Sequence, residues 1–122
     1  MENRLLVILF LLLVIVTGAC ATLSASDKGS VSETLKPSGI HEDCMELSSG
    51  QGIVYSFESS KSLNFNIHYH EDKNIIFGVK KDNTSHENGR FQAEKKQYYC
   101  LMWTNPQSEQ VKLVYTVNIE QR

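Results

Sequence analysis

The sequence predicts an all-β protein, an antiparallel β-sandwich. In several segments of the second half of the chain, apolar and polar residues alternate with a period of two, and β-branched and aromatic residues are frequent, as in half-buried strands. Clusters of Gly, Asn, Asp, Ser and Pro separate these segments and are typical of turns. No segment has apolar residues at helical spacing over three turns. Short strands joined by turns favour a sandwich or a barrel.

The first residues predict export. Arg4 precedes an uninterrupted apolar run, Leu5–Val16, which is shorter than the about 20 residues that span a bilayer but suits a secretory signal. The stretch VTGAC resembles the lipobox of bacterial lipoproteins, in which Cys20 would carry lipid. Its small residues also fit ordinary cleavage, and an uncleaved anchor is a further alternative. We expect a signal peptide over residues 1–19, a lipid anchor at Cys20, and a bacterial periplasmic or outer-membrane location.

Residues 20–40 are expected to form a flexible tether. They are rich in Ser, Thr, Gly and charge and show no hydrophobic periodicity, so they bury too little apolar surface to offset the entropy of ordering. One small domain then occupies residues 41–122. The net charge is −2 and no basic run stands out, which disfavours nucleic acid as a partner.

The domain is expected to contain strands separated by turns, in the following order. The predicted strands are Ile53–Phe57, Leu63–Tyr69, Asn74–Lys80, Tyr98–Trp103 and Val111–Ile119. The predicted turns are Ser48–Gly52, Glu58–Ser62, His70–Asn74, Asp82–Gly89 and Thr104–Gln110. In the third strand, alternation places Ile75, Phe77 and Val79 on one side. The fourth is apolar on both faces, as a central strand would be, with Trp103 facing the same way as Tyr99 and Leu101.

The cysteine count indicates a disulfide. The chain has 3 cysteines, and Cys20 is either lipidated or removed with the signal, which leaves Cys44 and Cys100 as one pair. An oxidising compartment favours their bond. A folded part of about 80 residues has a marginal core, and closing the long loop between these cysteines would add roughly 4 kcal/mol.

From Cys44 to Ile119 the sequence resembles the GOLD domain, the β-sandwich named from Golgi-dynamics proteins. The resemblance lies in a glycine turn before an aromatic strand, an apolar-x-Phe-x-Ile strand and a late Tyr-x-x-x-Trp-x-Asn pattern; the residues are Tyr55, Phe57, Leu63, Phe65, Ile67, Tyr99, Trp103, Asn105, Lys112 and Tyr115. It implies a sandwich whose start is joined to its late strand by a disulfide, here Cys44–Cys100. We expect a short exported version without the coiled coil, membrane span or lipid-transfer domain of family members, so the fold carries over and the trafficking role does not.

A pair of histidines forms the candidate site. His68 and His70 share a strand face with Asn64 and Asn66. Residues i and i+2 of a strand lie about 6.5–7 Å apart, so both imidazoles could hold Zn or Cu. The candidate third ligands are His86, His41, Glu58 and Glu71, none of which has a diagnostic spacing. The plainer interpretation is a solvated polar face. Asn and His both donate and accept hydrogen bonds, which would suit a polar ligand or partner protein.

The sequence therefore predicts a binding module and no enzyme. It has no Gly-x-Ser-x-Gly elbow, no zinc-protease helix motif and no P-loop. We expect an exported, lipid-anchored envelope module whose partners are the membrane, through the anchor, and a protein or small polar ligand. The alternatives are a periplasmic metal-binding protein using His68 and His70, with Zn or Cu as its cofactor, and a purely structural envelope component.

Overall fold

The structure is a computed structural model, which describes residues 29–120. The regular structure within this range is entirely β-strand: β1 (Val31–Leu35), β2 (Ile40–Leu47), β3 (Gly52–Glu71), β4 (Asn74–Gln92), β5 (Gln97–Thr104) and β6 (Val111–Ile119). Every strand pair is antiparallel, so the predicted all-β antiparallel sandwich is confirmed. Over the same residues, no helix is long and apolar enough to cross a membrane. The predicted signal peptide and Cys20 lie outside the described residues.

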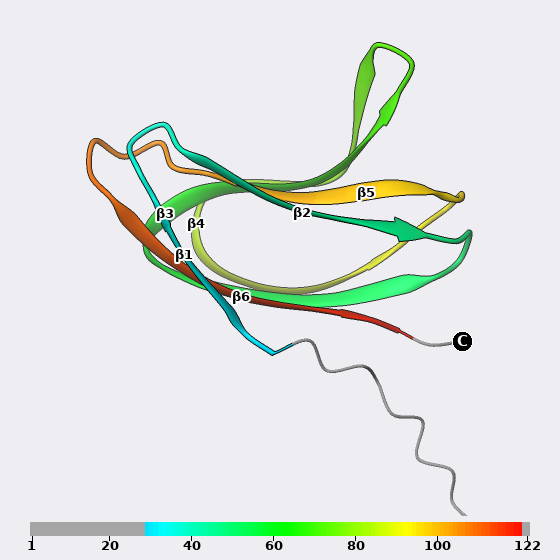
Figure 1. Cartoon of the computed structure of the whole chain (residues 1–122), viewed down its shortest axis with the longest axis horizontal. Coiled ribbons are helices and arrows are strands. Elements are labelled where there is room, and N and C mark those ends of the chain that lie inside the picture. Colours follow the sequence, from blue (N-terminus) through cyan, green and yellow to red (C-terminus); the bar gives the residue numbers. More distant parts are fainter. Residues whose placement is uncertain (1–28, 121–122) are drawn as a thin grey trace, which may run out of the picture.

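Two long strands, β3 and β4, run through both layers of the sandwich (Figure 1). The first half of β3 pairs with β6, from Ile53 opposite Ile119 to Ser59 opposite Leu113. Its second half pairs with β5, from Asn64 to His68. β4 follows β3 on its other side along nearly the whole length. One layer is therefore β1–β6–β3–β4 and the other is β2–β5–β3–β4.

Two of the predicted turns are instead irregular stretches inside these long strands. On the β4 side, the four residues 59–62 of β3 face only Ser85. The predicted turn Asp82–Gly89 belongs to β4. Asn83 has a φ of 56°, a left-handed conformation that Asn tolerates better than most residues. Bulges bend a strand and increase its twist. The turn-like composition therefore marks the place where both strands cross between layers, and the chain does not reverse there.

The first strand shows that the expected tether was wrong for part of residues 20–40. β1 pairs with β6 from Val31 opposite Tyr115 to Leu35 opposite Val111, and Leu35 is only 4% exposed. A short edge strand needs few apolar side chains, because the partner strand satisfies its backbone groups. The domain thus begins before residue 41, and only residues 29 and 30 separate β1 from the chain outside the described range.

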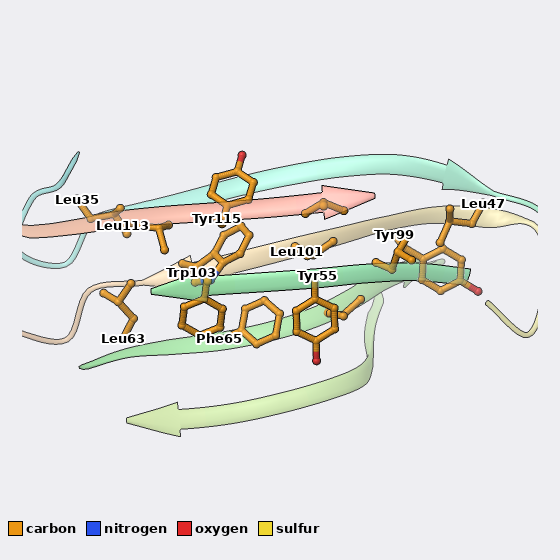
Figure 2. Packing of buried hydrophobic residues seen from close by; sticks show 14 of the residues in the cluster. Leu35, Leu47, Tyr55, Leu63, Phe65, Tyr99, Leu101, Trp103, Leu113 and Tyr115 are labelled. Carbon is orange, nitrogen blue, oxygen red and sulfur yellow. The ribbon is translucent and has the colours of Figure 1, made fainter. Parts of the chain in front are cut away.

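The core between the layers is built around Trp103, the single tryptophan of the chain. Trp103 is fully buried, and its ring lies 4.5 Å from that of Tyr115, 5.3 Å from Phe65 and 5.9 Å from Phe57, centroid to centroid. Figure 2 shows this aromatic cluster, with Leu35 and Leu63 toward one end and Leu47 and Tyr99 toward the other. Its indole N–H is buried without a hydrogen-bond partner among residues 29–120. The predicted inward direction of Trp103 is confirmed.

Strand β2 is tied to the rest of the sandwich in two ways. The predicted disulfide is confirmed: Cys44 is bonded to Cys100, which lies directly opposite it on β5. In addition, the Tyr115 hydroxyl of β6 donates to Oδ2 of Asp43 at 3.2 Å and lies 2.9 Å from Nε2 of His41. Burial, reinforced by the Asp43 carboxylate, raises the pKa of Tyr115, so the phenol stays protonated and can donate. These contacts connect the two layers directly, because β2 and β6 lie in different layers.

Candidate functional site

A bulge at Gly78 decides which side chains share a face with the histidine pair. Ile67 pairs with Val79 and His68 pairs with Phe77, so Gly78 has no opposite residue. An extra residue moves all following side chains to the other face. Val79 consequently packs against the core, while Phe77 lies opposite His68 on the outer face. The predicted common face for Ile75, Phe77 and Val79 is wrong for this reason.

His68 is buried on the outer face of the layer β2–β5–β3–β4. Its side chain is 3% exposed; the ring lies 6.1 Å from Phe77 and 5.2 Å from His70. On the other side His68 is in register with Cys100. Asn66 is also buried, whereas Asn64 is half-buried and His70 is exposed. The solvated polar face that alternation predicted is therefore wrong for Asn66 and His68, because side chains of the neighbouring strands cover them.

The imidazole of His68 has a defined protonation state. Its Nδ1 lies 2.7 Å from Oδ1 of Asn66, and because an amide oxygen only accepts, Nδ1 carries the hydrogen. Nε2 lies 3.7 Å from Oε1 of Glu42. Burial lowers the pKa of His68; the Glu42 carboxylate opposes this effect and His70 adds to it. His68 is therefore neutral near pH 7.

His86 does not lie near His68 and His70 and so does not supply a third metal ligand. That residue lies opposite Glu58, in the half of β4 that runs alongside the β6-pairing part of β3. Within residues 29–120, no group of three or more His, Cys, Asp or Glu side chains is arranged to hold a metal ion. His68 and His70 do lie together, as the sequence indicated, but Nδ1 of His68 is engaged by Asn66. Zn or Cu binding by this pair stays a prediction.

The most exposed apolar feature near the histidines is the hairpin that joins β3 to β4. Residues 69–79, here called the arm, project from the body of the sandwich (Figure 1). Three consecutive large side chains of the arm are exposed: Ile75 by 50%, Ile76 by 36% and Phe77 by 48%. Sequence alternation did not identify this surface, because it placed Ile75 and Phe77 on the same side as Val79, which packs against the core; the only local signal was the glycine inside the strand pattern.

The arm is held against the body at its base. Lys95 hydrogen-bonds Oε1 of Glu71, and its ammonium lies 4.8 Å from the centroid of the Tyr69 ring, a cation–π contact. Gln97 Nε2 donates to the His70 carbonyl at 3.2 Å. On the other side of the arm, Lys80 lies over the Phe77 ring at 5.7 Å. These contacts fix the direction in which the arm presents its apolar side chains.

The burial of His68 predicts a pH-dependent stability. The unfolded chain takes up a proton at His68 near the ordinary pKa of 6.5, whereas the folded chain, with its lowered pKa, does so only at lower pH. The contribution of His68 is thus fully present above about pH 6.5 and is lost as the pH falls, at no more than about 1.4 kcal/mol per pH unit. Urea unfolding of the wild type between neutral and mildly acidic pH should show this loss, and His68→Gln should have a flatter profile.

The matched control is the exposed His86, since His86→Gln removes an imidazole outside the buried site. Its pH profile should follow the wild type. Identical profiles for wild type and His68→Gln would contradict the burial of a neutral imidazole at this position.

Comparisons with known proteins identify the fold class. No protein-family model matches the sequence, and no curated protein matches it. Among solved structures, the chain is similar to PliG of Aeromonas hydrophila, a periplasmic inhibitor of g-type lysozyme, with 13% identity and a TM-score of 0.61 over 80% of this chain and 89% of that one. At this identity the likeness shows the fold alone.

Two further structures share this fold. One is the pre-peptidase C-terminal domain of a collagenase from Bacillus anthracis, with 15% identity and a TM-score of 0.57 over 73% of this chain and 87% of that one. The other is TmCBM61 in complex with β-1,4-galactotriose, with 10% identity and a TM-score of 0.55 over 76% of this chain and 70% of that one. The chain is thus a β-sandwich of a kind found in several unrelated settings.

Proposed function

We propose that this protein is an exported binding module that engages its partner through the arm. The observation that carries the proposal is the run of exposed apolar side chains at Ile75, Ile76 and Phe77. Single exposed apolar residues are ordinary on protein surfaces, but exposed apolar patches mark interaction sites; Ile75 and Phe77 share one side of the arm. Aromatic anchors such as Phe77 are also enriched where interfaces are buried.

The geometry of the arm supports a docking role. Ile75 and Phe77 face the histidine side, while Ile76 lies opposite Tyr69 and faces the other way, so the arm offers apolar surface on both sides. Its base is fixed by the contacts of Lys95 and Gln97. A recognition element that is held in place before binding loses less entropy on binding.

Export and lipid anchoring belong to this proposal. The apolar segment Leu5–Val16 and the small residues before Cys20 are its basis in the sequence, and they predict a bacterial envelope location. PliG is described as periplasmic and as an inhibitor, and TmCBM61 was solved with a saccharide; both descriptions support binding rather than catalysis for this kind of sandwich. Membership of the GOLD family stays a prediction from the sequence.

Site-specific photo-cross-linking tests the proposal. A photoreactive phenylalanine analogue is placed at position 77 in the producing cells, and at position 114 as the matched control. Val114 is exposed by 43% but belongs to β6, in the other layer. Discrete cross-linked products are expected from position 77 and not from position 114. Equal labelling at both positions, or labelling at 114 alone, would rule out the arm as the docking surface.

A further inference from the structure

Two adjoining depressions lie beside the base of the arm. The smaller, of about 250 Å³, is lined by the arm residues Tyr69, Ile76, Phe77 and Gly78 and by Phe91 and Tyr99. The larger, of about 560 Å³, is lined by Ser49, Gly50 and Ala93. Gln92 and Glu94 line both, so the two depressions adjoin at these residues and are together called the Gln92 groove here. Tyr99, which lines the smaller depression, lies toward one end of the core cluster in Figure 2.

One wall of the Gln92 groove is aromatic. The Tyr99 ring lies 5.3 Å from Tyr69 and 5.2 Å from Phe91, at interplanar angles of 65° and 57°. Tyr99 is buried, whereas Tyr69 and Phe91 are half-buried and so present part of their rings to the groove. Gly78 is required beside them, because a Cβ at that position would lie 2.5 Å from Cε2 of Phe91. The bulge that turns Phe77 outward therefore also lets the arm backbone approach the Phe91 ring.

The other wall is polar and carries oriented hydrogen-bonding groups. Gln92 Nε2 donates to the Gly50 carbonyl at 2.9 Å, which fixes the orientation of its carboxamide. The Ser49 hydroxyl donates to the Glu94 carbonyl at 2.8 Å and holds that backbone in place. Glu94 is exposed, and its carboxylate can accept hydrogen bonds only. The Lys95 ammonium is ion-paired with Glu71, which offsets part of the positive charge at the groove.

We infer that the Gln92 groove binds an uncharged oligosaccharide; this inference deepens the proposed function and rests on it, since it names the ligand class of the binding module. A pyranose ring has an apolar C–H face, which packs on aromatic rings, and a rim of hydroxyls, which donate to groups such as Gln92 Oε1 and the Glu94 carboxylate. A ligand groove typically measures about 300–1,000 Å³. The smaller depression alone falls below that range and the larger is open to solvent, so the inferred ligand is one that contacts both parts.

The same residues disfavour other ligand classes. A phosphate or another anion would meet the Glu94 carboxylate, while the lysine that lines the groove, Lys95, is paired with Glu71. An aliphatic chain would remove Glu94 and Gln92 from water without giving them hydrogen-bond partners, which is costly. A sugar fits both walls. Its C–H face packs on the aromatic rings, and its hydroxyls replace the water that hydrogen-bonds Gln92 and Glu94 in the free protein.

Nuclear magnetic resonance titration of the mature ¹⁵N-labelled protein tests the inference. β-1,4-Galactotriose, cellotriose and tri-N-acetylchitotriose are the saccharide probes, and inorganic phosphate is the anion probe. At least one saccharide should shift the amide signals of residues 76–78 and 91–95 saturably, while those of β6 stay in place. Gln92→Ala and Glu94→Ala should each weaken this binding by about tenfold, as expected for the loss of hydrogen bonds.

Gln110→Ala provides the matched control, because Gln110 is an exposed glutamine in the loop before β6 and does not line the groove. It should bind the saccharide like the wild type, and all three variants should unfold at the wild-type temperature. Failure of every saccharide to cause saturable shifts, or groove shifts with phosphate alone, would overturn the inference. Cross-linking at position 77 would then still decide whether the arm docks a partner, so the two failures are distinguishable.

Discussion

Trp103→Ala is expected to abolish cooperative folding of the domain. Trp103 is fully buried and contacts aromatic rings from β3 and β6, namely Phe65, Phe57 and Tyr115. Truncating a buried Trp typically costs about 3–5 kcal/mol, whereas small domains have a total stability of about 5–15 kcal/mol. Urea unfolding followed by far-ultraviolet circular dichroism should show no sigmoidal transition for the variant.

Trp103→Phe tests whether the stability lost in Trp103→Ala comes from the loss of aromatic packing. It keeps an aromatic ring and removes the indole N–H, which has no hydrogen-bond partner within residues 29–120. We therefore expect a smaller loss than for alanine and a retained cooperative transition. If Trp103→Ala unfolds cooperatively with a stability within about 1 kcal/mol of the wild type, the aromatic cluster is not the principal source of stability.

Removing the disulfide is expected to cost about 2–5 kcal/mol. Cys44 and Cys100 are 56 residues apart in the sequence, and the chain-entropy model gives about 4 kcal/mol for a loop of this length. Cys44 is exposed, whereas Cys100 is buried, so replacing both cysteines with alanine also removes some buried apolar surface at Cys100. The loss should therefore combine the freer unfolded chain with a smaller packing contribution from Cys100. Denaturation by guanidinium chloride of wild type and Cys44→Ala/Cys100→Ala measures it directly.

Reduction provides the control for the double variant. A dithiol reductant should lower the stability of the wild type to nearly that of Cys44→Ala/Cys100→Ala and leave the double variant unchanged. Two free thiols on native, folded protein from the producing cells would show that the bond does not form, and the predicted difference in stability would then disappear.

Much of the fold could be predicted from the sequence because its apolar pattern is local. The alternation of Val111–Ile119 appears directly as the burial pattern of β6, and Trp103 faces inward with Tyr99 and Leu101 as its strand phase requires. The Cys44–Cys100 pair followed from counting cysteines in an exported chain. Each of these predictions depends on a single strand or a single pair and not on how distant segments meet.

The exposed arm could not be predicted, because its faces depend on one unpaired residue. Nothing in the alternation of Asn74–Lys80 indicates that Gly78 is skipped in the pairing with β3, yet this one residue moves Phe77 from the core side to the outside. The burial of His68 depends on the same event, since Phe77 then packs against it. The alternation of apolar and polar residues also did not predict β1. This segment forms a strand because it pairs with β6, and its own composition does not indicate one.

The passage of β3 and β4 through both layers has a consequence for how the domain opens. In a sandwich whose layers share no strand, one sheet can detach while the other persists. Here each layer contains part of the same two backbones, so a local opening on one side strains the ladder on the other. The body of the sandwich should therefore exchange its protected amide hydrogens as a single foldon.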